Sequence, residues 1–222
     1  MDVFELRPVV APSLPNATSD YQQQYEDQYS NVLRLYFNQL TNFTRAITTS
    51  NGGAALTFPH IGASDTTDQY ATASNTPTIV KWNTLDTGSG FTLNPSYSAT
   101  AGYSGIYKID YSLQYANTAN AAHDVVIWLR INGVDVAGSA SKVTMPARKS
   151  AGVPSYVLAV SFVEFALDAG DDIELYWATD LAYNPVGPVD GVYMEYAPAQ
   201  TVPYPHPSIP SALGAITFIS AG

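Results

Sequence analysis

Hydrophobic and polar residues alternate over much of the chain from Thr78 onward, in short runs separated by turn-forming residues. The clearest unit is the apolar run at 125–131, which Asn132-Gly133 connects to a second run at 134–136. Asn-Gly tolerates positive φ at both central positions of a tight turn, so this segment predicts a β-hairpin. Further runs lie at 79–82, 91–93, 105–115, 156–167, 173–178, 192–196 and 215–219. Short strands in this number, without βα alternation, predict an all-β sandwich.

Residues 18–47 follow a helical periodicity instead. Their apolar stripe, with spacings of four and three, consists of Tyr29, Leu33, Tyr36, Leu40 and Phe43. It predicts an amphipathic helix, and Ser19 with Gln22 has the spacing of a capping box at its start. The stripe could pack on the helix's own domain, but we favour a short trimeric bundle because the next segment separates the helix from the strands. Two heptads are marginal alone, so the head would have to hold the chains together.

Two segments are not expected to have a core of their own. Residues 1–17 contain Pro8, Pro12 and Pro15, which disfavour a helix and predict an extended arm. Residues 48–77 are rich in Thr, Ser, Asn, Gly and Ala, which predicts a linker. The arm carries apolar side chains that are candidates for attachment to another surface, namely Phe4, Leu6, Val9 and Val10. We therefore expect an arm (1–17), a helix (18–47), a linker (48–77) and a strand-rich head (78–222).

The composition disfavours two classes of binding partner. The formal net charge is −10, which disfavours nucleic acid and anionic membranes because their phosphates repel such a surface. The chain has no cysteine, which excludes disulfides and thiolate metal sites. No run approaches the ~20 apolar residues of a membrane span, and the N-terminus lacks the pattern of a signal peptide. We therefore expect a protein made in the cytoplasm.

Side chains with catalytic or metal-binding chemistry do not form a recognisable motif. His60, His123 and His206 lack metal-ligand spacing, and neither a Gly-x-Ser-x-Gly elbow nor a phosphate loop occurs. The segment at 168–174 crowds four acidic residues that could hold calcium, but we favour a solvated turn, since polar residues are expected after Gly170. Paired carboxylates could serve a hydrolase, yet sequence alone does not single out a pair. We expect no catalytic residue, metal or cofactor.

Tyrosines are concentrated on one predicted strand. Tyr103, Tyr107, Tyr111 and Tyr115 are four residues apart and therefore share one face. An aromatic face can bind sugars, build a core or form a subunit interface. We favour the interface, with Tyr107 and Tyr111 as trimerisation candidates beside the helix stripe.

Several of these segments occur in an order that resembles a known family. They are Ile79-Val-Lys-Trp-Asn83, Phe91, 101–107, the hairpin at 130–134, Leu167-Asp-Ala-Gly-Asp171 and Ile216-Thr-Phe218. The order resembles the jelly-roll head shared by the tumour necrosis factors and the globular complement recognition domain. It looks closer still to the version in virion proteins of tailed phages, notably those of cyanobacteria, whose hairpin reads Trp-Leu-Arg-Ile-Asn-Gly, as at 128–133. A tyrosine-rich helix like 21–40 precedes their head.

The resemblance covers about residues 18–45 and 78–222, and it implies a compact homotrimer with aromatic and apolar residues along the three-fold axis. We therefore expect a non-enzymatic virion protein, a short fibre or knob that joins capsid, neck or tail proteins through its arm and helix. Its head is a candidate for binding host-surface glycan. A capsid decoration protein is the alternative, while a secreted lectin-like module and a glycan-degrading enzyme are rivals from other classes.

Overall fold

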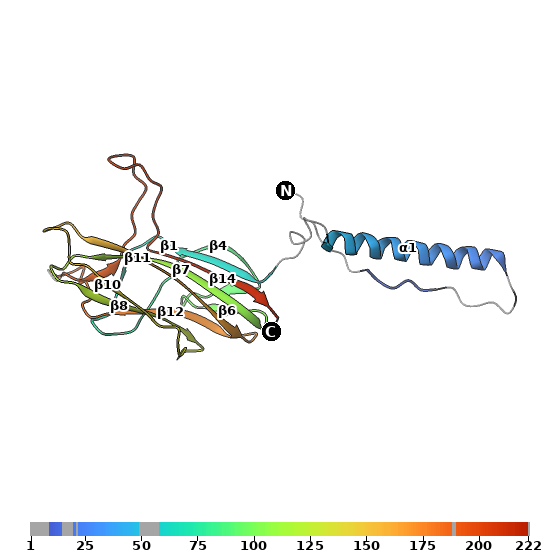
Figure 1. Cartoon of the computed structure of the whole chain (residues 1–222), viewed down its shortest axis with the longest axis horizontal. Coiled ribbons are helices and arrows are strands. Elements are labelled where there is room, and N and C mark those ends of the chain that lie inside the picture. The colour runs from blue at the N-terminus through green and yellow to red at the C-terminus, as the bar shows by residue number, and fades with distance from the viewer. Residues whose placement is uncertain (1–8, 15–19, 21, 49–57, 188–189, 222) are drawn as a thin grey trace. The chain divides into compact units, whose positions relative to one another are not determined.

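The computed structural model describes residues 9–14, 20, 22–48, 58–187 and 190–221. The chain divides into two compact units, Met1–Thr57 and Phe58–Gly222 (Figure 1). The first unit contains the helix and the second contains all the strands of the described part. Each unit is therefore considered by itself.

Helix α1 spans Gln23–Thr48. Its first turn forms on the carbonyl of Gln22, which accepts hydrogen bonds from the backbone N–H groups of Tyr25 and Glu26 at 3.0 and 3.2 Å. The helix therefore begins later than the capping box predicted, and Ser19 lies outside the described residues. Glu26 in the first turn and Arg45 in the last turn complement the helix dipole. The C-terminal end agrees with the predicted range within one residue.

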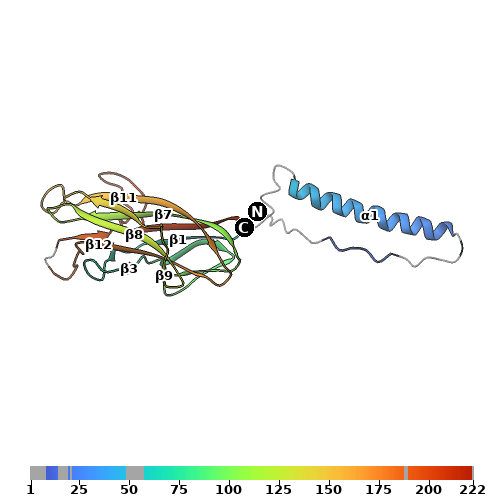
Figure 2. The ribbon, with the colours of Figure 1, turned by 60° about the horizontal axis from the view of Figure 1, so that its bottom comes forward.

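The second unit is a sandwich of two antiparallel sheets (Figures 1 and 2). The first sheet has the order β2-β13-β7-β14-β1-β4, and β11 pairs with β7. Its strands are β1 (His60–Asp65), β2 (Gln69–Tyr70), β4 (Thr84–Ser89), β7 (Gly105–Asn117), β11 (Ser155–Leu167), β13 (Val192–Met194) and β14 (Ala212–Ser220). Since β1 and β14 are neighbours, the two ends of the unit meet in one sheet.

The second sheet has the order β10-β8-β12-β6-β5, with β3 paired to β12 and β9 paired to β8. Its strands are β3 (Thr78–Ile79), β5 (Phe91–Leu93), β6 (Ala99–Ala101), β8 (His123–Ile131), β9 (Val134–Asp135), β10 (Ser141–Met145) and β12 (Asp172–Thr179). This arrangement confirms the predicted jelly-roll β-sandwich preceded by one helix.

The predicted linker at 48–77 is wrong in its second half. Strand β1 lies inside that range and pairs with β14 on one side and β4 on the other. Its residues are small, yet Ile61 and Ala63 belong to the core. At Gly62 an added Cβ would come within 3.2 Å of Thr87 Cγ2, so a side chain there would crowd the neighbouring strand. The head therefore begins at Phe58 rather than Thr78.

The core forms between the sheets around β7. Tyr107 packs edge-on against Phe91 and Phe218, with ring centroids 5.3 and 5.4 Å apart, and Tyr115 lies 5.4 Å from Trp177. Tyr107, Tyr115 and Trp177 are each 0% exposed. Alternate residues of β7 point toward the second sheet, because side chains alternate across a strand.

The choice of Tyr107 and Tyr111 as trimerisation residues is therefore wrong. Their exposed fractions are 0% and 3% within the single chain, so a partner subunit has almost no surface of theirs left to cover. They share one face as predicted, but that face belongs to the core. The Tyr107 hydroxyl also donates to the Tyr103 carbonyl at 2.8 Å, which ties the preceding loop to the core.

The hairpin between β8 and β9 has the predicted turn. Asn132 and Gly133 have φ values of 52° and 76°, so both central residues are in the left-handed region of a type I′ turn. Asn132 Nδ2 also donates to Asp171 Oδ1 at 2.8 Å, and its Oδ1 accepts from the Asp172 N–H at 2.9 Å. The turn is therefore fixed both by its own backbone and by hydrogen bonds to the turn between β11 and β12.

Gly133→Val should lower the free energy of unfolding by about 1–3 kcal/mol. An added Cβ would meet nothing within 4 Å, so the loss would come from placing a β-branched residue at positive φ. Chemical denaturation of the wild type and the variant measures the difference. Gly133→Asn is the matched control, because Asn tolerates this conformation and should lose less. Equal stability of Gly133→Val and wild type would contradict the assigned turn.

Candidate functional site

An apolar row on strand β11 is the most prominent exposed feature of the head. The outward side chains of Leu158, Val160 and Phe162 are 59%, 65% and 61% exposed, and Tyr156 continues the row. In the described part of the chain β11 pairs only with β7, so its other edge carries unpaired backbone groups. Figure 2 shows β11 along one margin of the sandwich. A long, exposed apolar edge strand presents a surface that another chain can cover.

One more exposed apolar side chain lies on the outer face of the first sheet, beyond a polar residue of β7. Ser112 on β7 lies between Val160 on β11 and Leu213 on β14, and cross-strand partners share one face. Leu213 is also exposed. We call the surface formed by Tyr156, Leu158, Val160, Phe162 and Leu213 the apolar face.

An ion pair on β7 lies beside the apolar face, and the exposed Glu164 on β11 is the cross-strand partner of its lysine. Lys108 Nζ lies 2.8 Å from Asp110 Oδ1 and 4.9 Å from the centroid of the Phe162 ring. The ammonium group thus has a carboxylate partner and an aromatic partner before any subunit approaches. Covering this surface would therefore bury Lys108 and Asp110 as a neutral pair, while the Glu164 carboxylate would add a cost of desolvation unless it stays at the rim.

Sequence reasoning identified β11 as a strand but missed its role. Val157, Ala159, Val163 and Phe165, on the inward side, are half-buried hydrophobic residues packed against the core. Both sides of the strand are therefore apolar, and alternation gives no signal for which side faces out. The pairing of β11 with β7 in the folded sheet determines which side of β11 faces the core and which side faces outward.

The helix and arm candidates lie in the first unit. Tyr29, Leu33, Tyr36 and Phe43 are half-buried on α1, and Leu40 is exposed. In the arm Val9 is half-buried and Val10 is exposed, while Phe4 and Leu6 lie outside the described residues. Their roles in trimerisation and attachment therefore stay predictions. Within the described residues, helix α1 lacks the long apolar stretch that a membrane span requires.

Three tyrosines stack at one end of the first sheet. The ring centroids of Tyr70, Tyr183 and Tyr193 are 4.9–5.7 Å apart. The Tyr70 hydroxyl donates to Asp68 at 3.0 Å, and the Tyr193 hydroxyl donates to Glu195 at 2.9 Å. Burial and the Asp68 carboxylate raise the pKa of Tyr70 to about 12, and burial with Glu195 raises the pKa of Tyr193 further above its usual value. These rings stack on one another, so we interpret the cluster as structural.

Stability should fall at alkaline pH because of this cluster. The pKa of Tyr70 is raised from 10.0 to about 12 in the folded state, so its contribution is fully present below pH 10 and is lost as the pH rises through 12. Thermal unfolding between pH 9 and 12 measures the effect. Tyr70→Phe should show a shallower fall than wild type. Tyr204→Phe, at a ring that is 77% exposed, should keep the wild-type slope, and equal slopes in all three proteins would contradict the assignment.

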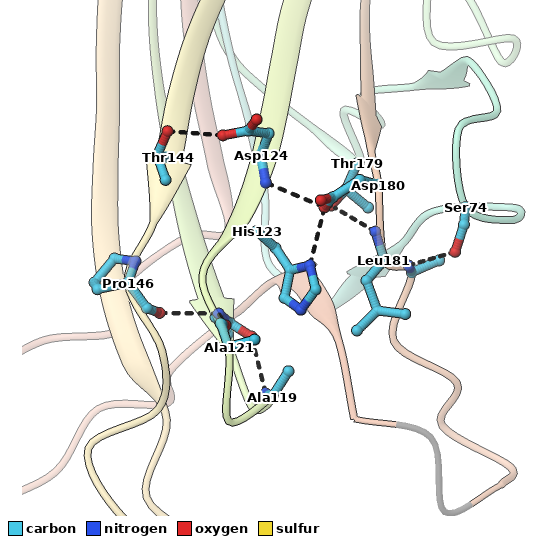
Figure 3. Close-up of polar contacts among 12 residues, drawn as sticks. Ser74, Ala119, Ala121, His123, Asp124, Thr144, Pro146, Thr179, Asp180 and Leu181 are labelled. Carbon is cyan, nitrogen blue, oxygen red and sulfur yellow. Dashed lines mark hydrogen bonds and ion pairs between the residues drawn. The ribbon is translucent and has the colours of Figure 1, made fainter.

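His123 at the start of β8 forms a polar contact with the loop after β12 (Figure 3). Its Nδ1 lies 3.1 Å from Asp180 Oδ1, which also accepts the Asp124 N–H at 3.1 Å. The Asp124 carboxylate in turn accepts from Thr144 Oγ1 at 2.7 Å and pairs with Lys142 Nζ at 2.5 Å. These hydrogen bonds from Lys142 and Thr144 lower the pKa of Asp124. The contacts join three strand ends, and in Figure 3 the dashed line from His123 leads to Asp180.

Two of the four carboxylates in the acidic turn at 168–174 accept hydrogen bonds. Asp171 Oδ2 accepts from the Asp168 N–H at 2.8 Å, and Asp172 accepts from the Thr100 hydroxyl and from Asn94 Nδ2. These contacts fix the turn after β11. Among the described residues, no group of three or more His, Asp or Glu side chains is arranged to hold a metal ion.

A further charged group lies on the outer face of the second sheet. The Arg130 guanidinium carbon lies 4.0 Å from the centroid of the Tyr176 ring, and Trp128 packs 6.0 Å from the same ring. Asp135 accepts hydrogen bonds from Arg130 Nε at 2.5 Å and Trp128 Nε1 at 2.6 Å. These bonds, the one from Arg130 first, hold the pKa of Asp135 below its usual value. The group links the two strands of the hairpin.

Similarity to known proteins was found among solved structures. No protein family model matches the chain, and no curated protein matches its sequence. The Eiger TNF of S. frugiperda is 12% identical, with a TM-score of 0.45, and the match covers 74% of this chain and 95% of that one. Murine APRIL is 13% identical, with a TM-score of 0.43, and the match covers 73% of this chain and 100% of that one. This likeness concerns the fold alone.

Proposed function

We propose that the protein is a homotrimeric virion component, a short fibre or knob held by its N-terminal arm and helix. The observation that carries the oligomeric part is the apolar face on β11 and β14. Three neighbouring side chains of β11 are each more than half exposed, although they belong to a strand of 13 residues in a well-formed sheet. A monomer would leave this patch in water, whereas contacts between copies would remove it.

Three copies suit these features better than two. The apolar face joins an edge strand to the flat outer surface of the same sheet, so the edge of one copy can pack on the surface of the next. Such a contact joins two different patches, and it forms a closed trimer when successive copies are related by a rotation of a third of a turn. The a/d stripe of α1 provides a second place where chains can meet, since helices with this spacing form short bundles. The contact through the apolar face involves only the head, and the contact through α1 involves only the first unit.

The virion part of the proposal rests on the resemblance and on the division of the chain. One unit carries an arm and an amphipathic helix, and the other carries a compact head. This division would allow the first unit to attach the protein to the particle while the head is displayed. The head is proposed to act by binding and not by catalysis, because His123 and the acidic turn make structural contacts. Capsid decoration is the alternative to a fibre or knob.

Sedimentation analysis and labelling of particles test the two parts separately. Equilibrium sedimentation of the purified protein should give three times the chain mass at micromolar concentration, and a monomer would overturn the oligomeric part. An antibody against the head should label purified phage particles at the tail or neck. Label spread over the capsid would favour the decoration protein, and absence of label from particles that carry the gene would overturn the virion role.

Deletion of residues 1–17 should leave a folded trimer that no longer joins particles. The arm carries three prolines that disfavour a helix and apolar side chains that are proposed to contact another virion protein. Circular dichroism and sedimentation check the fold and the trimer, and labelling of particles assembled with the truncated chain measures incorporation. A matched variant that replaces Val9 and Val10 by Ser separates apolar contacts from arm length. Normal incorporation of the truncated chain would place attachment elsewhere.

A further inference from the structure

An open pocket lies on the second sheet, at the β5–β6 edge. Its volume is about 400 Å³, within the usual range for small-molecule sites. Gly90 and Gly102 form one side, and Thr92, Thr100 and Tyr103 provide side chains. The apolar face belongs to the other sheet, so the two surfaces are distinct.

Glycine backbone keeps this pocket open. The Gly102 N–H donates to the Gly90 carbonyl at 2.8 Å, and a Cβ at Gly102 would come within 2.8 Å of that carbonyl oxygen. Gly90 has a φ of 71°, and a Cβ there would lie 3.1 Å from the Tyr103 ring. Side chains at either position would therefore crowd the wall or displace the ring. The close approach of two backbone segments defines the shape of the pocket.

The lining combines a flat aromatic surface with fixed polar groups. Tyr103 is 60% exposed, and its backbone carbonyl is held by the buried Tyr107 hydroxyl at 2.8 Å. Thr92 and Thr100 are cross-strand partners and therefore share the outer face. The Thr100 hydroxyl bonds to Asp172 and accepts from Asn94 Nδ2 at 2.8 Å, so it has a defined position before a ligand arrives. The pocket is thus preorganised.

We propose that this pocket binds a neutral saccharide. A pyranose presents an apolar C–H face that can pack on the Tyr103 ring, and hydroxyls that can exchange hydrogen bonds with Thr92 and donate to the remaining lone pair of the Thr100 hydroxyl. The lining residues include no Lys, Arg or His, and the protein carries a formal charge of −10, so an anionic ligand would be repelled.

This inference deepens the proposed function, since it rests on the proposed display role of the head and gives that role a ligand class and a site. An array of neutral and acidic oligosaccharides, followed by calorimetric titration of the hits, tests it on the full-length protein. We expect saturable binding of a neutral saccharide that Tyr103→Ala weakens at least tenfold. Tyr103→Phe keeps the ring face and should retain most of the affinity. Tyr204→Ala removes an exposed tyrosine elsewhere and should bind as wild type.

Unchanged affinity in Tyr103→Ala would overturn the assignment, and so would binding of acidic saccharides alone or of none at millimolar concentration. The melting temperature of each variant confirms that the head is folded. Particle labelling is independent of these titrations. If the protein is absent from particles but its saccharide binding depends on Tyr103, the virion role is overturned and the assignment of the pocket stands. If the protein is present on particles but its saccharide binding does not depend on Tyr103, the assignment of the pocket alone is overturned.

Discussion

Val160→Asp should convert the proposed trimer into monomers. Val160 lies at the centre of the exposed row on β11, with Leu158 and Phe162 as its neighbours on the same side. Full burial of such a side chain stabilises by roughly 1.5–3 kcal/mol, and a trimer loses this three times. The association constant should therefore fall by on the order of a thousandfold or more. The carboxylate adds a further cost, because it would have to leave water in an apolar interface.

Equilibrium sedimentation over a range of concentrations measures this change. Val186→Asp is the matched control, since it introduces the same charge at a loop residue that is 96% exposed, and it should remain trimeric. The head should stay folded in both variants, because Val160 points away from the core and its removal leaves the inter-sheet packing intact. A trimeric Val160→Asp protein would mean that the subunits associate through another surface.

Trp177→Ala should cause the largest loss of stability of any substitution considered for this protein. Trp177 is 0% exposed, projects from β12 between the sheets and packs against Tyr115. Truncation of a buried tryptophan to alanine typically costs about 3–5 kcal/mol, because contacts are lost and a cavity remains. For a domain of this size the melting temperature should fall by roughly 6–20 °C.

Trp128→Ala provides the comparison on the adjacent strand. Trp128 pairs with Tyr176 on β12, the residue next to Trp177, so its side chain lies on the opposite, outer face. Trp128→Ala should lower the free energy of unfolding clearly less than Trp177→Ala, because water can fill the space that the Trp128 ring leaves. Thermal unfolding at a fixed protein concentration measures both variants, since assembly makes the melting temperature depend on concentration. Equal losses would mean that Trp177 is not the inter-sheet residue.

Local chemistry made the hairpin and several strands predictable. The turn at Asn132-Gly133 depends on two residues that tolerate positive φ, and their neighbours alternate, so the unit can be read without distant contacts. The long strand β7 alternates in the same way over 13 residues, so it was also predictable from the sequence. The helix was also found from its period, although its first turn forms on Gln22 and not at the predicted cap.

Strand β1 could not be found in this way. Its residues, His-Ile-Gly-Ala-Ser-Asp, have the composition of a linker, and the strand forms because β14 supplies partners about 150 residues later in the chain. Likewise, the open pocket depends on Gly90 and Gly102 meeting across the edge of the second sheet. Glycines in turns are common, so their positions in the sequence gave no indication of a pocket.

The sequence by itself determined which residues alternate, where the chain reverses and that the class is an all-β sandwich, because these depend on neighbours a few residues apart. Only the tertiary structure decided which face of each strand is buried. Tyr107 and Tyr111 share a face that meets the second sheet and became core, whereas Val160 and Phe162 belong to a face that no described strand covers. Burial is a property of the packed sheets, so equally apolar residues can stabilise the monomer on one side and remain available for a partner on the other.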